Sequence, residues 1–198
     1  MTRILIVGED ALCCALGERL VAQALPGWTL AGPPIDTKGI TRLVSSLPRY
    51  ARQARELRPV LCIGDSDGRC VKQLLGQWLP KEVPDRFVLR LAVAEAESWL
   101  LADRHGFAKG LGVPINKLPR HADALADPKL AVLGLVARSS KRMFRDEIVS
   151  RVDPTRRGAG YNVHLSAFVR THWDACRARE CSPSLARAWR RVLALESH

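Results

Sequence analysis

The sequence predicts an α/β fold, in which a mostly parallel sheet is flanked by helices and followed by a helical C-terminal extension. Over the first 105 residues or so, short apolar runs alternate with segments of helical periodicity, and this alternation is typical of parallel sheets covered on both faces. Beyond that point the strand-like runs stop and the pattern becomes helical. With 198 residues, of which 47% are hydrophobic, the chain can bury a core of this size.

Each expected strand is an apolar run bounded by residues that break regular structure. The first run ends at Gly8, the second is followed by the loop Gly32-Pro33-Pro34, and Pro59 precedes the third. In chain order, the expected strands are 3–7, 28–31, 60–64 and 87–93.

The expected helices lie between these strands and carry apolar residues three or four positions apart. The first helix has leucines at positions 12, 16 and 20 and ends at Pro26-Gly27. The second, 40–47, is expected to close at Pro48, and a basic helix is expected over 49–57. The third, 71–78, stops before Pro80, and a fourth starts within 98–103.

The C-terminal half is expected to be helical after a loop-rich passage that contains Gly106, Gly110, Gly112 and Pro114. Asp127 followed by Pro128 predicts a helix start, because aspartate is a good N-cap and proline suits the first helical turn. Two closing helices are expected over 165–179 and 185–195. The predicted domains are 1–105 and 106–198, with a soft boundary, so that both parts can also form one continuous domain.

The net charge of +11, from 31 basic and 20 acidic residues, indicates either a solvated basic surface or an anionic partner. Clustering favours a nucleic acid, because arginines recur every third residue from Arg49 to Arg58 and a second cluster spans 138–157. The residues expected to contact nucleic acid are Arg49, Arg52, Arg55, Arg69, Arg142, Arg156 and Arg157.

Acidic residues follow three of the expected strands. Asp65 and Asp67 come after 60–64, and residues i and i+2 of an extended segment point to the same face. Glu9 follows the first strand and Glu97 the fourth, and the carboxyl ends of parallel strands share one edge. Converging carboxylates favour a Mg²⁺ or Mn²⁺ site at this edge. The alternative is that Asp10 and Asp65 only cap helices, which does not explain paired acids at successive strands.

Two short passages resemble a known family. These are IGDSDGRC at 63–70 and AEAESWLLAD at 94–103, and both are similar to a small, largely uncharacterised Toprim-like family of bacterial proteins related to the OLD-type nucleases. DPK at 127–129 and the passage at 158–173 also look familial. The resemblance implies a Toprim, Rossmann-like fold and a role in DNA cleavage, repair or phage defence, in some cases beside an ATPase partner protein.

By this resemblance, Asp65, Asp67 and Glu97 would coordinate one or two Mg²⁺ (or Mn²⁺) ions, and Glu9 would complete the metal shell or act as general base. The catalytic residues would be Glu9, Asp65 and Asp67. Arg69 would either neutralise the scissile phosphate or form an ion pair with Asp67. The chain departs from the Toprim pattern in one respect: it reads Val-Gly-Glu where the family reads Val-Glu-Gly. The shift turns Glu9 to the other face unless the strand kinks at Gly8.

Three other functions are alternatives to a metal-dependent nuclease. The shifted glutamate favours a non-catalytic module that binds nucleic acid or a partner protein. A response-regulator receiver would use Asp65 as its phosphorylated residue, but the turn and the late lysine of such domains are missing. A nucleotide-binding Rossmann protein would need a glycine-rich phosphate loop, and neither GxGxxG nor a P-loop is present.

The expected location is the cytoplasm. The N-terminus runs directly into a strand-like segment without the features of a secretion signal, and no apolar run is long enough for a membrane. The six cysteines show no CxxC spacing, which favours reduced thiols over a metal or disulfide framework. The sequence contains no indication of the oligomeric state.

Overall fold

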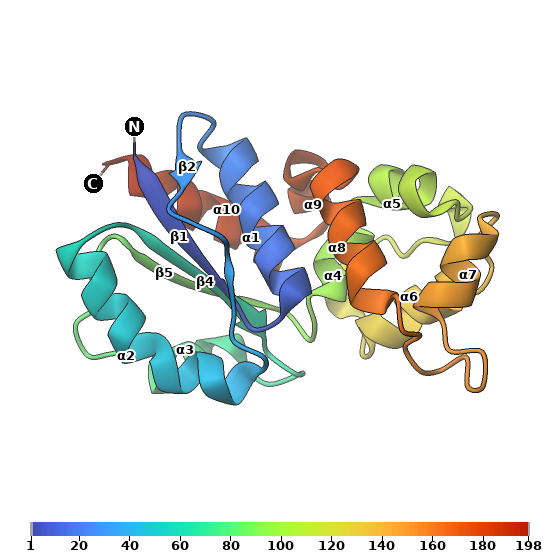
Figure 1. The fold of residues 1–198 in the computed structure, drawn as a ribbon, viewed down its shortest axis with the longest axis horizontal. Helices are drawn as coiled ribbons and strands as arrows, with labels where there is room; N and C mark the ends of the chain where they lie inside the picture. The colour runs from blue at the N-terminus through green and yellow to red at the C-terminus, as the bar shows by residue number, and fades with distance from the viewer. Residues whose placement is uncertain (1, 198) are drawn as a thin grey trace.

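The parallel sheet that the sequence predicts occupies the left-hand half of the molecule in the view of Figure 1. The computed structural model describes residues 2–197. The sheet has five strands in the order β2-β1-β4-β5, with β3 also pairing with β1, and every pairing between them is parallel. The strands are β1 (Arg3–Gly8), β2 (Thr29–Leu30), β3 (Ile35–Asp36), β4 (Val60–Asp65) and β5 (Phe87–Ala92).

Both faces of the sheet are covered by helices, because the central strands β1 and β4 carry apolar side chains on both of their faces. Ile4 and Ile6 of β1 pack into a core with α1 (Ala11–Ala24) and the C-terminal helices. Leu5 and Val7 pack on the opposite face, against α2 (Ile40–Glu56) and α3 (Val71–Trp78). The predicted fold class is therefore confirmed.

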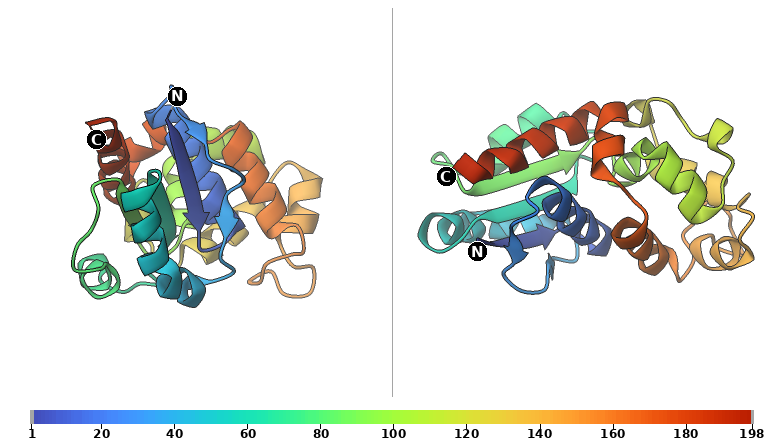
Figure 2. Two further views of the ribbon diagram at one scale, coloured as in Figure 1. Left: turned by 60° about the vertical axis from the view of Figure 1, so that its left-hand side comes forward. Right: turned by 90° about the horizontal axis from the view of Figure 1, so that it is seen from above.

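The C-terminal half is a group of helices that continues the core on the α1 face. Its long last helix runs along the edge strand β5, which is visible in the right-hand view of Figure 2. These helices are α4 (Glu97–Ala102), α5 (Arg104–Leu111), α6 (Pro128–Val136), α7 (Arg142–Ile148), α8 (Tyr161–Thr171), α9 (Ala175–Cys181) and α10 (Pro183–Leu193), with short 3₁₀ turns at Ile115–Lys117, Ala122–Ala124 and Ala194–Ser197.

Several expected boundaries were wrong. Pro48 does not close a helix but lies inside α2, because Leu47 and Tyr50 on either side of it are buried in the core and hold the helix together. The stretch 165–179, expected as one helix, is divided between α8 and α9. The short strand β3, which immediately follows the expected 32–34 loop, was not predicted.

The passage with Gly106, Gly110, Gly112 and Pro114 was expected to be rich in loops, but its first part belongs to α5. Gly110 serves close packing here, since a Cβ atom at this position would lie 2.7 Å from the ring of Phe168. Gly106 is equally crowded, by the carboxyl group of Asp103. Both glycines are needed where helices approach each other, and local sequence rules do not register such contacts.

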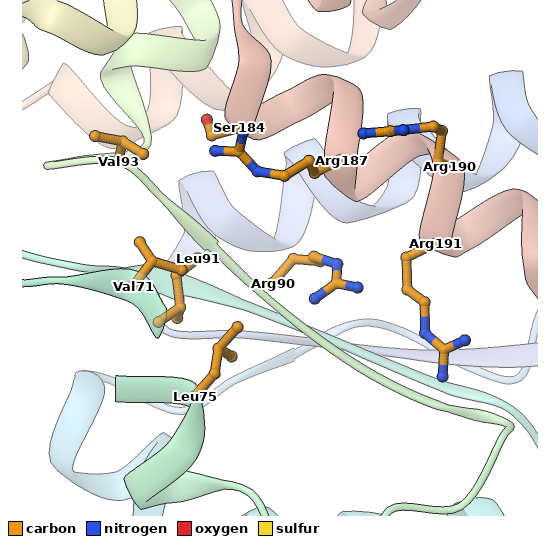
Figure 3. Close-up of a pocket in the computed structure, with 9 residues that line it drawn as sticks. All are labelled: Val71, Leu75, Arg90, Leu91, Val93, Ser184, Arg187, Arg190 and Arg191. Atoms are coloured by element: carbon orange, nitrogen blue, oxygen red, sulfur yellow. The ribbon is translucent and has the colours of Figure 1, made fainter. Parts of the chain in front are cut away.

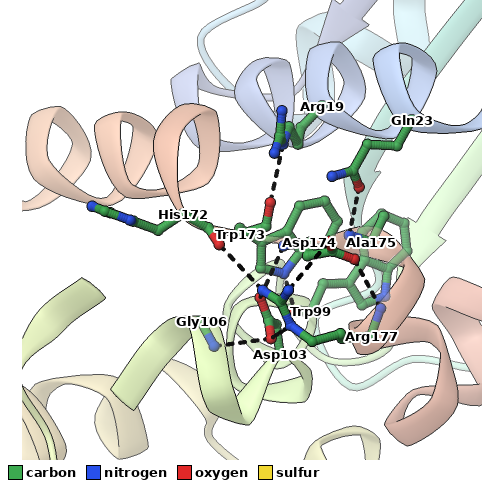
Figure 4. Close-up of polar contacts among 10 residues, drawn as sticks. All are labelled: Arg19, Gln23, Trp99, Asp103, Gly106, His172, Trp173, Asp174, Ala175 and Arg177. Atoms are coloured by element: carbon green, nitrogen blue, oxygen red, sulfur yellow. Dashed lines mark hydrogen bonds and ion pairs between the residues drawn. The ribbon is translucent and has the colours of Figure 1, made fainter. Parts of the chain in front are cut away.

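A buried carboxylate, Asp103, ties α4 and α5 to α9 (Figure 4). Its side chain is fully buried and accepts hydrogen bonds from the backbone N–H groups of Gly106 (3.0 Å) and Asp174 (2.8 Å). Arg177 completes the set with a two-pronged ion pair, donating from Nε and Nη2 at 2.8 Å each. Above this network, the indole of Trp173 donates to the carbonyl oxygen of Trp99.

Among residues 2–197, no helix is long and apolar enough to span a lipid bilayer.

Candidate functional site

Three carboxyl groups from separate strand ends lie close together at the carboxyl edge of the sheet. Glu9 directly follows β1, Asp65 is the last residue of β4, and Glu97 begins α4 after β5. The Glu9 carboxylate accepts a hydrogen bond from the backbone N–H of Asp65 (2.9 Å), and the charges of both glutamates act on the Asp65 carboxyl. We call these three residues the acidic cluster.

The carboxyl group of Asp65 has a strongly raised pKa. Burial, followed by the negative charges of Glu97 and Glu9, raises the pKa of this carboxyl from 3.8 to about 9. The thiol of Cys13 in α1 lies 3.9 Å from Asp65 Oδ1 and is its weak donor. Asp65 does not cap the following helix, since the N-cap position of α3 is Cys70 and no side-chain hydrogen bond caps this helix. Asp10, in contrast, does cap α1 by accepting from the N–H of Cys13. Helix capping therefore explains Asp10 but not Asp65.

Glu9 faces Asp65 although it stands one position later than in the Toprim pattern. Its backbone N–H still donates to the carbonyl oxygen of Ile63 in β4 (2.9 Å), so the sheet pairing continues beyond β1. Burial and then the negative charge of Asp67 raise the pKa of Glu9, against the lowering effect of the N–H of Asp65. The orientation that the sequence left open is thus towards the site.

Gly8 places Glu9 through its small size. It stays paired with β3 and β4, and α1 begins so close that a Cβ atom on Gly8 would lie 2.5 Å from the backbone nitrogen of Cys14 and 2.8 Å from the carbonyl oxygen of Asp10. Both obstacles are backbone atoms that cannot rotate away. The glycine therefore allows close approach of a helix to a strand end.

Gly8→Ala is expected to destabilise the protein by about 1–3 kcal/mol, because the added methyl group must push α1 away from the sheet. Urea unfolding followed by circular dichroism measures this change. Gly27→Ala is the matched control, since a Cβ atom at Gly27 meets nothing within 4 Å. Equal stability of the two variants would contradict the steric role of Gly8.

Glu97 is almost fully buried, with 3% of its surface exposed. Its Oε1 accepts a hydrogen bond of 2.6 Å from the hydroxyl of Tyr161 in α8. Burial raises the pKa of Glu97, and the positive charge of Lys129 and the tyrosine hydrogen bond oppose that rise. Burial and the charge of Glu97 also raise the pKa of Tyr161, so the phenol stays protonated and keeps donating.

Lys129 brings a positive charge to this edge of the sheet. Its Nζ lies 2.5 Å from Glu95 Oε1, and its backbone N–H donates to the other oxygen of Glu95 at 2.9 Å. Burial alone would lower the pKa of Lys129. The negative charges of Glu97, Glu95 and Asp65, together with the hydrogen bond to Glu95, outweigh this effect and raise the pKa. Sequence reasoning did not assign Lys129 or Tyr161 to the site. Both lie in passages that only looked familial, far along the chain from the strands.

Asp67 does not converge with Asp65 in the way that the alternation of a strand predicts. β4 ends at Asp65, and Asp67 has a left-handed backbone with a φ of 48°. The Asp67 side chain is 53% exposed and pairs with Arg69, whose Nη2 lies 3.7 Å from Oδ2. The ion pair, one of the two expected roles of Arg69, is present, and Asp67 lies at the rim of the site.

The donor set of the acidic cluster fits a hard divalent cation in chemistry, because it consists of carboxylate oxygens. In residues 2–197, however, no three His, Cys, Asp or Glu side chains converge closely enough to hold a metal ion as they stand. One oxygen each of Glu9 and Glu97 is already engaged with a protein donor. A metal would therefore require rotation of these side chains.

The basic stripe on α2 extends away from the acidic cluster. Arg49 donates to the hydroxyl of Tyr50 (3.0 Å), and Arg55 pairs with Glu82 (3.4 Å). Arg58 lies just before the start of β4, whereas Asp65 lies at the end of that strand. The five residue steps from Val60 to Asp65 span about 17 Å. Arg52 lies on α2 between Arg49 and Arg55. The stripe thus runs from the middle of α2 towards the amino end of β4 and does not gather at the acidic cluster.

The second basic cluster includes a residue next to the site. The guanidinium of Arg157 lies 5.7 Å from the ring centre of Tyr161, whose hydroxyl contacts Glu97. Arg142 and Arg156 instead form exposed ion pairs with Asp146 (3.3 Å) and Asp153 (3.2 Å). Of these three predicted contacts for nucleic acid, Arg157 is the one that the structure connects to the acidic cluster.

Comparison of the chain with protein-family models, with curated proteins and with solved structures finds no match.

Proposed function

We propose that this protein is a Toprim-like, divalent-metal-dependent hydrolase of nucleic-acid phosphodiesters, with its metal bound at the acidic cluster. One observation carries the proposal. Three carboxyl groups from three strand ends lie at one edge of the sheet, and burial raises the pKa of each of them. At Asp65 the negative charges of Glu97 and Glu9 raise the pKa further.

This arrangement is costly for a purely structural site. Buried carboxylates are normally paired with a cation, and removal of a charge from water without a partner destabilises a fold. The nearby cation, Lys129, makes its direct contact with Glu95 and not with the acidic cluster. A bound Mg²⁺ or Mn²⁺ ion would compensate the remaining negative charge and would hold Asp65 in its ionised form.

In this proposal, Asp65 and Glu97 hold the metal, and Glu9 completes the shell or accepts a proton from water. The metal, when bound, activates water and stabilises the leaving oxygen of the phosphodiester. Tyr161 fixes the carboxylate of Glu97 by its hydrogen bond. Asp67 and Arg69 lie at the exposed rim, where Arg69 can exchange its long ion pair for a phosphate oxygen.

The test is cleavage by the purified chain of supercoiled plasmid, of single-stranded DNA and of RNA. With Mg²⁺ or Mn²⁺ we expect nicked plasmid or shortened strands, and with EDTA we expect intact substrate. Cleavage that persists in EDTA would exclude the metal from the reaction. Intact substrates under every metal condition would contradict the hydrolase.

A non-catalytic module for nucleic acid or a partner protein is the second candidate. It is favoured by the hydrogen bonds that already occupy Glu9 and Glu97, and by the absence, within residues 2–197, of three side chains in metal-binding positions. This candidate predicts oligonucleotide binding that is equal in EDTA and in Mg²⁺, without cleavage. A gel-shift assay run beside the cleavage assay distinguishes the two functions.

A further inference from the structure

A positively charged pocket lies at the edge strand β5, away from the acidic cluster. A cavity of about 400 Å³ opens between β5, α3 and α10, and Figure 3 shows four arginine side chains along it. This volume falls within the usual range of small-molecule pockets. The four arginines come from two parts of the chain that are almost 100 residues apart. They are Arg90, Arg187, Arg190 and Arg191.

Arg90 occupies a position in β5 where an apolar residue is expected. Its neighbours on the same face of the strand, Val88 and Ala92, are buried in the core beneath α1 and α10. The guanidinium of Arg90 donates from Nη1 to the carbonyl oxygen of Leu89 (3.0 Å), but its buried Nε has no hydrogen-bond partner. A buried donor without a partner is unfavourable, and a bound acceptor would satisfy it.

The other three arginines form one side of α10. Arg187, Arg190 and Arg191 follow the i, i+3, i+4 spacing that places side chains on one helix face. No carboxylate of residues 2–197 lies within 4 Å of the guanidinium nitrogens of these residues or of Arg90. Burial, followed by the charges of Arg191 and Arg187, lowers the pKa of Arg90 to about 10. The site therefore holds like charges together without a counterion from the protein.

The opposite wall of the pocket is apolar, because Val71 and Leu75 of α3 and Leu91 of β5 line it. Guanidinium groups bind phosphate oxygens through two parallel hydrogen bonds, and an apolar wall can pack against the flat face of a base. We propose that this pocket binds a nucleotide unit, with its phosphate on the arginines and its base against the apolar wall. The unit is either a free nucleotide or part of a nucleic-acid strand.

The test is calorimetric titration of the full chain in EDTA, so that the outcome does not depend on metal or cleavage at the acidic cluster. The probes are AMP, ATP and a twelve-residue oligothymidylate, with inorganic phosphate and a polyglutamate peptide for comparison. We expect a nucleotide or the oligonucleotide to bind at least about tenfold more tightly than phosphate or polyglutamate. Equal or tighter binding of polyglutamate would overturn the proposal in favour of an acidic protein partner.

Arg90→Met is the decisive variant. We expect it to weaken nucleotide binding about tenfold or more and, at the same time, to raise the melting temperature by about 2–4 °C, because it removes a buried charge that is repelled by its neighbours. A residue with only a structural role would show a lower melting temperature. Arg120→Gln is the control for the loss of one charge and should change neither value, because Arg120 is exposed, lies between the 3₁₀ turns Ile115–Lys117 and Ala122–Ala124, and belongs to neither basic cluster.

The double variant Arg187→Gln, Arg191→Gln tests the same pocket from the α10 side, where the side chains are exposed or half-buried and folding is not at risk.

Competition between ATP and the oligonucleotide then identifies the source of the nucleotide unit. If the oligonucleotide binds through Arg90 and displaces ATP, the unit belongs to a strand. If ATP alone depends on Arg90, it is a free nucleotide. Wild-type affinity for every probe in both variants would overturn the proposal.

Discussion

Asp65→Asn is expected to abolish metal-dependent cleavage and also to stabilise the metal-free protein. Asparagine keeps an oxygen next to Cys13 but cannot supply a negatively charged ligand, so we expect cleavage to fall by at least about 100-fold. In EDTA the variant should melt several degrees higher than the wild type, because the wild-type carboxyl must be protonated to fold at neutral pH. Plasmid nicking and thermal melting, with and without Mn²⁺, measure both effects.

The pH dependence of this stabilisation has a definite sign. The pKa of Asp65 is about 9 in the folded protein and near 3.8 in an ordinary environment, so the wild-type carboxyl destabilises the fold increasingly as the pH rises from about 4 to 9. The advantage of Asp65→Asn should therefore vanish near pH 4. At pH 7 we expect it to reach about 2 kcal/mol, which is less than the full shift implies because the site is partly hydrated.

Asp67→Asn is the matched control, two positions away and 53% exposed. Its melting temperature in EDTA should equal that of the wild type, since exposed ion pairs contribute little. Two outcomes would contradict our assignment of Asp65. Cleavage by Asp65→Asn at the wild-type rate would place the metal elsewhere, and a lower melting temperature in EDTA would give the carboxylate a structural role.

Asp103→Ala is expected to destabilise the protein by about 3–5 kcal/mol. The change removes a fully buried acceptor from two backbone N–H groups and from both donor nitrogens of Arg177. This one side chain links the junction of α4 and α5 to the start of α9 (Figure 4). Guanidinium chloride unfolding, followed by the fluorescence of the buried Trp99 and Trp173, measures the loss.

Asp127→Ala provides the comparison, because Asp127 also caps a helix with its carboxylate but is exposed at the start of α6. Loss of this cap alone should cost about 1 kcal/mol. The difference between the losses of unfolding free energy in the two variants then measures the contribution of the ion pair with Arg177 and of the hydrogen bond from the backbone N–H of Asp174. A cost for Asp103→Ala no larger than that for Asp127→Ala would mean that the network contributes little to stability.

The passage at 94–103, which resembles a Toprim-like family, divides into two roles in the structure. Glu97 belongs to the acidic cluster, whereas Trp99 and Asp103 hold the helical half together. The sequence predicted the place of Glu97 because parallel strands share their carboxyl edge. It could not predict the role of Asp103, since its partner Arg177 is 74 residues away.

Asp65 and Asp67, at and just beyond the end of β4, show a limit of prediction from local sequence. The expectation that residues i and i+2 share a face holds only while the backbone is extended, and the backbone leaves the strand after Asp65. Asp67 then takes a left-handed conformation and donates its N–H to the carbonyl oxygen of Ala94 (2.8 Å). For Glu9, the shifted position left open which face of the strand the side chain takes. The sheet pairing and the small Gly8 place its carboxylate within hydrogen-bond distance of the backbone N–H of Asp65.

The sequence by itself determined the alternation of strands and helices, the fold class and the edge at which Glu9, Asp65 and Glu97 collect. These features follow from periodicity and chain direction, which act between near neighbours. Only the tertiary structure decided which charges meet. It placed Lys129 on Glu95 and Arg90 beside the arginines of α10. Such pairs are set by the packing of distant segments around a shared core, and no local pattern in the chain encodes that packing.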